Sequence, residues 1–442
     1  MALRDVKLRD PAASWADLNL ERFRKSHQPI VWLLAPLIGL ATGAAAILFR
    51  LAIGVFQLPW LHTMSERVAA AAREQPWWVI LIAPAAGGLL DGLILRYLLV
   101  GKRTDTVADV MEARISAGRY LRLSQGLLSA LASALSLGTG ASAGREGPIV
   151  HLGATIATAA CASFNLPNAA RRTLLAAGVA GAVAASFNAP IAGVLFAQEV
   201  ILGHFALTSF APLVLASVTA TIVSQAWFGN IAAFTVPAYQ ITSYLEVPAF
   251  VLLGIVAAAV AVIFQVSLIG TDWVARNIRM PLVARPVVGG LLIGLIAIWF
   301  PEVLGVGYDT TDAALKDQLP IALMFALLVA KTAATAIALA SRFGGGVFSP
   351  SLYLGAMTGG AFGLIAAHAF PAVGSSEGLY AILGMGAVTA AVLGAPISTT
   401  VMIFELTGGF ALSLALLLTL SIGNGISQAI LGRSYFQALL ES

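Results

Sequence analysis

The sequence has few charged residues and a single cysteine. Asp, Glu, Lys and Arg make up only 10% of the 442 residues, whereas 59% are hydrophobic. A soluble globular chain has about 25% charged residues, so most of this protein is expected to face lipid or other apolar helices. The lone cysteine, Cys161, excludes a framework of disulfide bonds.

The chain also lacks the patterns of several other classes of protein. Its five histidines show no H-E-x-x-H spacing, which argues against a metal-dependent hydrolase. We therefore expect no enzyme activity, no metal and no cofactor. The basic residues are spread among loops without interleaved aromatic residues, so nucleic acid is not an expected partner.

Long apolar runs recur along the whole chain. Roughly 20 apolar residues cross a bilayer as a helix; several runs reach this length, and others are shorter or are interrupted by Gly and Pro. The 43 glycines suit close helix packing in lipid. We therefore predict an all-α integral membrane protein that crosses the cell membrane several times. The runs are Val31–Phe56, Trp78–Val100, Leu123–Ala143, Leu174–Ala185, Phe205–Phe228, Phe250–Ile269, Val287–Phe300, Leu319–Ala340, Leu352–Phe370 and Ala411–Leu431.

Residues 1–29 precede the first span and contain no short apolar core with a cleavage site, so no signal peptide is predicted. The part from Ser14 to Lys25 is either an amphipathic surface helix or a polar tail. The chain stops soon after the last apolar run, so we expect a cytoplasmic C-terminus without a soluble regulatory domain. A cytoplasmic N-terminus is favoured by the positive-inside rule, because the segment contains Arg4, Lys7, Arg9, Arg22, Arg24 and Lys25.

Two short motifs occur twice, in the same order. GREGPIVHLGA, which begins at Gly144, resembles GVFSPSLYLGA, which begins at Gly346, 202 residues further on. APIAGVLFAQE, which ends at Glu199, resembles APISTTVMIFE, which ends at Glu405, 206 residues further on. Two matches in register indicate a duplication. We therefore expect one membrane domain, residues 30–440, made of two repeats at approximately residues 30–230 and 247–440, with a binding site between them.

The first motif pair predicts two bends inside the membrane. The stretches SLGTGASAGREGP and ASRFGGGVFSP are too rich in Gly and Pro to continue one helix. Each is expected to end one helix and to start another at or just after its proline. A helix N-terminus presents unpaired backbone N–H groups and a partial positive charge, and it therefore binds anions. Two such ends, one from each repeat, would hold an anion between them.

Glu146 lies within the first bend. An ionised carboxylate at a helix N-terminus would itself occupy the anion site, and protonation or competition by an incoming anion would release it. Glu146 is therefore a candidate gate that responds to pH and to anion concentration. The alternative is that Arg145 and Glu146 form an ordinary ion pair in an exposed loop.

Three motifs together resemble the CLC family of chloride channels and proton–chloride exchangers: GREGP (Gly144–Pro148), GGVFSP (Gly345–Pro350) and FNAP (Phe187–Pro190). The resemblance extends from the first apolar run to Leu440. It implies a homodimer with one anion pathway in each subunit, and many short, tilted helices in two repeats of inverted topology. Among the subgroups, the chain is most similar to the short bacterial members that lack cytoplasmic regulatory domains.

The resemblance also implies roles for individual residues. Glu146 would be the gating and proton-accepting glutamate. The implied partners are chloride, protons, the lipid bilayer and a second subunit. Backbone amides from both bends would hold the anion, namely those of Arg145, Glu146 and Gly147 on one side and those of Val347, Phe348 and Ser349 on the other.

The chain departs from the family pattern where a serine usually contacts the central anion. Thr104-Asp105-Thr106 stands in place of Gly-Ser-Gly. An ionised Asp105 would repel an anion, so we expect its side chain to point away from the pathway. The hydroxyl of Thr106, or a backbone N–H, would serve instead. The alternative is that this stretch is a cytoplasmic loop away from the pathway.

Two further departures concern proton transfer and the inner barrier. Exchangers of the family often have an inner glutamate directly after the position of Glu199, where this chain has Val200. Glu199 is expected to be a structural, hydrogen-bonded residue, and His204 is an alternative proton carrier. The family's central tyrosine falls at Phe436 by register, which we prefer, with Tyr435 one residue away.

The resemblance implies chloride transport, with coupled proton exchange favoured slightly over passive conduction. A family member that prefers fluoride or nitrate is an alternative, because the central stretch is altered. The remaining charges in the apolar runs are assigned no chemistry. We expect them at or near the ends of spans, where they can reach the interface or pair; they are Arg50, Asp91, Arg96, Lys331 and Arg342.

Overall fold

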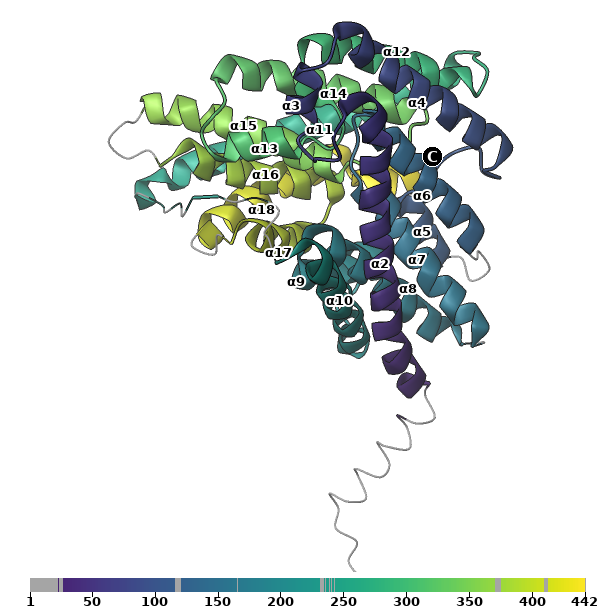
Figure 1. Cartoon of the computed structure of the whole chain (residues 1–442). Coiled ribbons are helices and arrows are strands. Elements are labelled where there is room, and N and C mark those ends of the chain that lie inside the picture. The colour runs from purple at the N-terminus through teal and green to yellow at the C-terminus, as the bar shows by residue number, and fades with distance from the viewer. Residues whose placement is uncertain are drawn as a thin grey trace, which may run out of the picture.

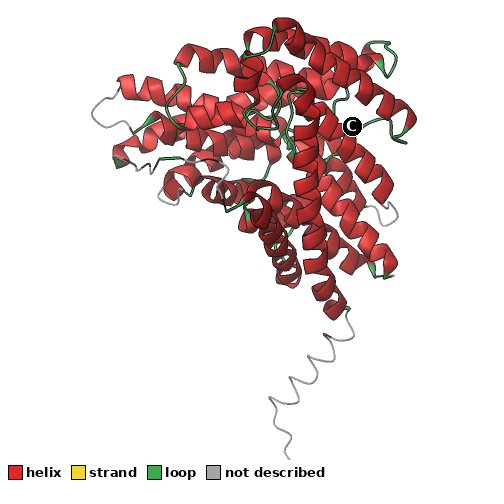
Figure 2. Ribbon diagram, viewed as in Figure 1, coloured by secondary structure: helices red, strands yellow, loops and turns green. Residues whose placement is uncertain are grey.

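The computed structural model describes residues 23, 27–115, 121–164, 166–230, 234, 236, 237, 239, 241, 243–369, 375–408 and 412–441. Within these ranges the chain is almost entirely helical (Figure 2), and the single β-type pairing is an isolated antiparallel bridge between Gly144 and Gly346. The predicted surface helix from Ser14 to Lys25 lies outside the described residues, apart from Phe23.

The first part of the chain forms helices of very different lengths. α7 starts at the predicted gate residue, and α9 continues directly into the π-helical turn η1. The elements are α2 (Gln28–Leu61), α3 (Val68–Arg73), α4 (Trp77–Tyr97), α5 (Val107–Ile115), α6 (Leu123–Gly138), α7 (Glu146–Ser163), α8 (Asn168–Phe187), α9 (Pro190–Phe196), η1 (Ala197–Leu202) and α10 (Leu207–Phe228).

The second part repeats the same kind of succession, with helices starting directly after a glycine-rich bend and again at an Ala-Pro pair. The elements are η2 (Tyr244–Glu246), α11 (Val247–Asn277), α12 (Ala284–Trp299), η3 (Pro301–Val303), α13 (Tyr308–Leu315), α14 (Ile321–Ala340), α15 (Phe348–Ala369), α16 (Glu377–Leu393), α17 (Pro396–Thr407), α18 (Ser413–Leu431) and α19 (Tyr435–Glu441).

Among the described residues, seven helices are long and apolar enough to cross a membrane, and four further apolar helices are shorter. This agrees with the expectation that some apolar runs reach the length of a span and others do not. α2 is the longest and passes between two groups of helices in Figure 1, with α6, α7 and α8 on its right and α15, α16 and α18 on its left. The chain is thus a multi-pass membrane protein.

Glycines bring the central helices into close contact. A Cβ atom added to Gly153 of α7 would lie 2.4 Å from the carbonyl oxygen of Gly178 in α8. The equivalent atom on Gly355 of α15 would lie 2.4 Å from the carbonyl oxygen of Gly384 in α16. Both helix pairs therefore pack backbone against backbone, as small residues allow in membrane proteins, and this places the starts of α7 and α15 in the interior.

The second motif pair links the two parts of the chain reciprocally. The carboxylate of Glu199, in η1, accepts hydrogen bonds of 3.0 and 2.7 Å from two backbone amides in the first turn of α17. The carboxylate of Glu405, in α17, accepts bonds of 3.0 and 2.7 Å from two amides in the first turn of α9. Each glutamate thus satisfies N–H groups that have no partner within their own helix. Glu199 is hydrogen-bonded as expected.

Candidate functional site

The two glycine-rich bends meet in the interior of the protein. The backbone N–H of Gly144 donates to the carbonyl of Gly346, and the N–H of Gly346 donates to the carbonyl of Gly144, both at 2.7 Å. α7 begins at Glu146 and α15 begins at Phe348, each two residues after this pair. Two helix N-termini, with their unpaired amides and partial positive charge, therefore converge on one region.

The side chain of Glu146 lies between these two helix starts. Its Oε1 accepts hydrogen bonds from the hydroxyl of Tyr308 at 3.0 Å and from the hydroxyl of Ser349 at 2.5 Å. A Cβ atom added to Gly144 would lie 2.5 Å from Oε2 of Glu146 and 3.1 Å from the amide nitrogen of Ser349. The carboxylate is therefore close to the N-terminus of α15, where an anion would be stabilised.

Glu146 and Arg145 are both buried, with exposed fractions of 2% and 7%. The alternative of an ordinary ion pair in an exposed loop is therefore wrong. The physical reason is the bend itself: both residues lie between the Gly144–Gly346 pair and the first turn of α7, and this part of the chain is inside the protein.

The surroundings of Glu146 can offset the cost of burying its charge. A charged side chain at the centre of a bilayer costs about 2.5–3.5 kcal/mol on insertion scales. A hydrogen bond to a charged group contributes about 1.5–3 kcal/mol, and a helix N-terminus contributes up to about 2 kcal/mol in a partly buried geometry. Two hydroxyl donors to Oε1 and the nearby N-terminus of α15 therefore offset much of this cost, whereas Oε2 accepts no hydrogen bond from the described residues.

Arg145 turns away from Glu146 and forms an ion pair with Glu66, which also pairs with Arg50 at 2.7 Å. The guanidinium of Arg145 also donates to the carbonyl of Ser186 at 3.3 Å, and its central carbon lies 4.9 Å from the centre of the Tyr308 ring. Burial raises the pKa of Glu66, but the two arginines more than offset this and hold the pKa of its carboxyl below its usual range.

A cavity of about 620 Å³ reaches Glu146 from one side. Phe348 lies in its wall, and its ring centre is 4.9 Å from that of Phe187 and 6.3 Å from that of Phe196, so three aromatic rings lie together in the wall of this cavity. Most of the predicted site residues line this cavity, namely Glu146, Gly147, Val347, Phe348, Thr106, Tyr435 and Phe436. Ser349 does not line the cavity, but its hydroxyl donates a hydrogen bond to Glu146.

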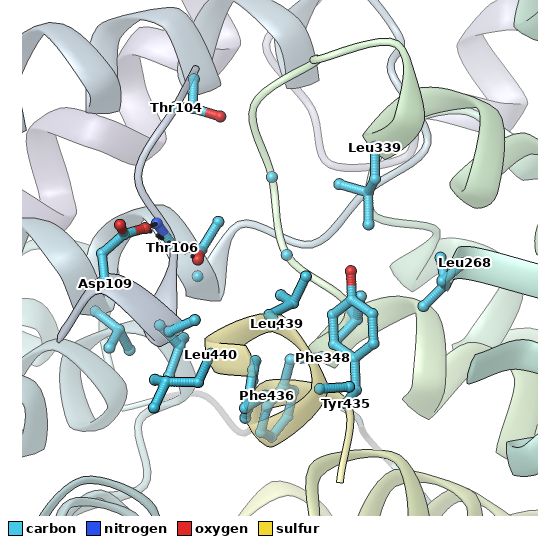
Figure 3. Close-up of a pocket in the computed structure, with 18 of the residues that line it drawn as sticks. Thr104, Thr106, Asp109, Leu268, Leu339, Phe348, Tyr435, Phe436, Leu439 and Leu440 are labelled. Carbon is cyan, nitrogen blue, oxygen red and sulfur yellow. Dashed lines mark hydrogen bonds between the residues drawn. The ribbon is translucent and has the colours of Figure 1, made fainter. Parts of the chain in front are cut away.

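Tyr435 and Phe436 both line the cavity, and their ring centres are 6.2 Å apart. Figure 3 shows the Tyr435 hydroxyl directed upward near Leu268 and Leu339, with the Phe436 ring lower in the wall. Both predicted positions of the inner aromatic residue therefore lie in the wall, and of the two residues Tyr435 is the one that brings a hydroxyl into the cavity.

The stretch in place of the usual serine does lie at the cavity. Thr106 is in the wall, but both its N–H and its hydroxyl donate to Oδ2 of Asp109, at 2.8 and 3.2 Å (Figure 3). Asp105 is absent from the cavity wall; its N–H donates to the hydroxyl of Ser129 at 2.7 Å, and its carboxylate lies 3.7 Å from Nε2 of His151. The hydroxyl proton of Thr106 therefore points to Asp109 and not to an ion in the cavity.

A second cavity, of about 260 Å³, lies on the other side of the bends. Arg50, Glu66, Arg145 and Tyr308 are in its wall, and Glu146 is not. The hydrogen bond from Tyr308 to Glu146 therefore joins a residue of the small cavity to a residue of the large one. Sequence reasoning missed Tyr308, because no motif marks it and 162 residues separate it from Glu146.

The other candidate proton carriers lie away from both cavities. Neither Glu199, Val200 nor His204 is in either wall. The carboxylate of Glu199 accepts hydrogen bonds from two backbone amides of α17. Nδ1 of His204 accepts a hydrogen bond of 3.3 Å from the N–H of Ala206 in an exposed turn. No group of three or more possible metal ligands occurs among the described residues.

Two charged residues expected near span ends are instead buried inside the protein. Lys331 is in the middle of α14, is 0% exposed, and donates to the carbonyls of Val303 and Gly305, each at 2.9 Å. Asp91 in α4 is also buried and accepts a hydrogen bond from the hydroxyl of Ser136. The expected position at or near a span end is wrong for both, and of the two expected ways to satisfy the charge, both residues pair with polar groups within the bundle.

The apolar helices and the carboxylate buried between two helix N-termini define a class: a polytopic membrane protein with an acidic side chain in its interior where two helices begin. A sequence model described as voltage gated chloride channel matches residues 86–428. A ClcB-like protein of Ralstonia nicotianae is 34% identical over 394 residues, 88% of this chain and 92% of that protein. The H(+)/Cl(-) exchange transporter ClcA of Cronobacter sakazakii is 30% identical over 428 residues, 93% of this chain and 89% of that protein. The chain therefore belongs to the voltage-gated chloride channel family, also called the CLC family.

The fold matches solved structures of the same family. The crystal structure of a slow cyanobacterial Cl⁻/H⁺ antiporter superposes with a TM-score of 0.82 over 93% of this chain and 97% of that chain, at 23% sequence identity. At this identity the likeness establishes the fold alone. The predicted CLC-like, all-α membrane fold is confirmed.

Proposed function

We propose that this protein transports anions, chiefly chloride, through each subunit, with Glu146 as gate and proton acceptor. The observation that carries the proposal is the position of the Glu146 carboxylate. It lies beside the N-terminus of α15, with hydroxyl donors of 3.0 and 2.5 Å, at the boundary between the two cavities. An anion that crosses from one cavity to the other must take the place of this carboxylate, because both need the same donors.

The pathway is proposed to run from the large cavity to the small one through the gap between the two bends. Backbone amides at the starts of α7 and α15, from Arg145 to Gly147 and from Val347 to Ser349, would replace part of the hydration shell of the anion. Amides hold an anion without a fixed cation in contact with it. Such weak binding is what rapid conduction needs.

The sidedness follows from the proposal that both termini are cytoplasmic. α19, the last helix, lines the large cavity, whereas the small cavity lies toward the C-terminal end of α2, away from the N-terminal end of that helix. The large cavity would then open to the cytoplasm and the small cavity to the outside. Tyr435 and Phe436, both in the wall of the large cavity, would form the inner barrier.

Proton–chloride exchange is proposed ahead of passive conduction. Support comes from Glu146, a buried carboxylate that can take up a proton as it leaves its position, and from the Cl⁻/H⁺ antiporter of the same fold. The position after Glu199 is a valine, and the nearby His204 does not reach the cavity. Water in the large cavity would therefore have to carry the proton to the cytoplasm. A passive chloride channel is the alternative.

The test is a flux assay on purified protein in liposomes, with chloride and proton movement recorded together. An outward chloride gradient should drive proton uptake in the wild type, and Glu146→Gln should abolish both this uptake and any dependence of chloride flux on pH. Chloride flux without proton movement in the wild type would establish the passive channel. Normal coupled exchange by the Gln variant would contradict the assignment of Glu146.

The identity of the anion needs its own comparison. The hydroxyl of Thr106 is directed to Asp109, whereas Thr104 of the same stretch also lies in the wall of the large cavity. We propose chloride as the main substrate, with fluoride and nitrate as alternatives. Efflux of chloride, bromide, nitrate and fluoride from identical liposomes ranks them, and a preference of tenfold or more for fluoride or nitrate would replace chloride in the proposal.

We propose that the protein forms a homodimer in which each subunit has its own pathway. The two repeats, residues 30–230 and 247–440, are proposed to have inverted topology. The reciprocal contacts of Glu199 and Glu405 support this arrangement. Counting of photobleaching steps in lipid bilayers should give two copies per particle.

A further inference from the structure

Tyr308 is the residue through which the small cavity contacts Glu146. Its hydroxyl donates to Oε1 of Glu146 at 3.0 Å, and its ring is in the wall of the small cavity. Glu146 is in the wall of the large cavity only. The other donor to Oε1, the hydroxyl of Ser349, comes from α15 and lines neither cavity.

Two contacts with its ring and the backbone conformation of the preceding residue hold Tyr308 in place. Phe234 packs edge to face against it, with ring centres 5.5 Å apart. The guanidinium carbon of Arg145 lies 4.9 Å from its centre, a distance typical of a cation–π contact. Tyr308 also starts α13, directly after Gly307, whose φ of 85° is a left-handed conformation that favours glycine. The hydroxyl therefore has little freedom to move away from Glu146.

Lys331 stabilises the turn that precedes Tyr308. Its ammonium donates to the carbonyls of Val303 and Gly305, both at 2.9 Å. A fully buried ammonium group requires such partners. The two carbonyls accept these hydrogen bonds, and the bonds link the turn to α14. This gives the position of Tyr308 a rigid support that is independent of Glu146.

We propose that Tyr308 is a positioning residue that sets the pH at which Glu146 leaves the anion pathway. This inference rests on the proposed function of Glu146. A hydroxyl that donates to the carboxylate favours its ionised form, in which it blocks the pathway. When Glu146 takes up a proton, this advantage is lost, and the side chain is free to leave. Tyr308 thus delays opening until a lower pH than Glu146 would need alone.

Other charged groups near Glu146 must stay constant for this effect to be measured. They include Arg145, which directly precedes α7, Arg50 of α2 and Glu66 in the segment before α3. The other charged residues in the wall of the large cavity are Arg103, Asp109, Glu112, Asp272, Arg276, Arg342, Arg433 and Glu441. None of them makes a hydrogen bond with the hydroxyl of Tyr308 among those recorded for the described residues. Removing that oxygen alone therefore leaves the ion pairs between Glu66 and the two arginines in place.

The test is the chloride flux of Tyr308→Phe in liposomes over a range of pH, with wild type alongside. Flux should rise on acidification in both proteins, and the midpoint of the variant should lie about one pH unit or more higher, the shift expected for one lost hydrogen bond to a charged group. Tyr353→Phe is the matched control, because Tyr353 is also fully buried but its hydroxyl makes no hydrogen bond with Glu146. Its midpoint should equal that of wild type.

A double variant separates positioning from a general structural effect. In the Glu146→Gln background, Tyr308→Phe should change neither the pH dependence nor the rate by more than about twofold, since the group on which it acts is gone. An unchanged midpoint in Tyr308→Phe, or a shift to lower pH, would overturn this inference. A Glu146→Gln variant that keeps the wild-type pH dependence would instead overturn the proposed function itself.

Discussion

At the residue scale, the site depends on a position without a side chain. A Cβ atom on Gly144 would lie 2.5 Å from Oε2 of Glu146 and 3.1 Å from the carbonyl oxygen of Gly346. The first distance is shorter than any ordinary contact, so either the carboxylate or the backbone must move. Glycine here is required by close approach, and not by its φ angle.

Gly144→Ala should therefore displace Glu146 from its position. We expect chloride flux at neutral pH to rise or its dependence on pH to weaken by at least half, because the added methyl group occupies the space of the carboxylate. Stability should fall by about 1–3 kcal/mol, the usual cost of overpacking a buried position. Liposome flux at several pH values and thermal unfolding in detergent measure the two effects.

Gly270→Ala is the matched control for this variant, because nothing lies within 4 Å of a Cβ atom at Gly270 in α11. Alanine is the better helix former by about 1 kcal/mol, so this control should be as stable as wild type or more so, with normal flux. If Gly144→Ala kept both the wild-type pH dependence and the wild-type stability, the close contact between Gly144 and Glu146 would not exist in the protein.

At the scale of helices, the two glutamates of the second motif hold the short helices α9 and α17 against each other. Each carboxylate accepts two backbone N–H groups at the start of the opposite helix. Both helices begin at a proline, which lacks an N–H and so reduces the number of amides that need a partner. A carboxylate at a helix N-terminus also interacts favourably with the helix dipole.

Replacing Glu199 or Glu405 with Gln should destabilise the protein by about 1–3 kcal/mol each, because an amide can accept but brings no charge and points one NH₂ group at the backbone donors. The apparent melting temperature in detergent is the measurement. Since Glu199 lines neither cavity, the pH midpoint and the proton coupling of Glu199→Gln should match wild type. Loss of coupling at unchanged melting temperature would place Glu199 in a proton path instead.

At the scale of the whole molecule, the sequence allows some contacts to be predicted and not others. The bends around Gly144 and Gly346 and the position of Glu146 at the first bend are visible because glycine, proline and charge occur together in short motifs. The contacts of Tyr308 and Lys331 are not, because they join segments that meet only after folding. Lys331 was expected near a span end, since its carbonyl partners, 28 and 26 residues away, belong to no recognisable pattern.

The arrangement of both halves around one buried carboxylate also makes a prediction about global stability. An anion that binds between α7 and α15 stabilises the folded protein, by about 2.7 kcal/mol at a concentration of one hundred times its Kd. Under the proposed mechanism, the anion has to displace Glu146 of the wild type at neutral pH from the donors of Tyr308 and Ser349. In Glu146→Ala the same site is vacant.

Chloride should therefore raise the melting temperature of Glu146→Ala more than that of wild type at pH 7.5, and the difference should shrink at pH 4.5, where protonation releases Glu146. Thermal unfolding in detergent with increasing potassium chloride, against equal concentrations of potassium gluconate to correct for ionic strength, measures this effect. Equal stabilisation of the two proteins by chloride at pH 7.5 would mean that the anion and the carboxylate do not compete for one site.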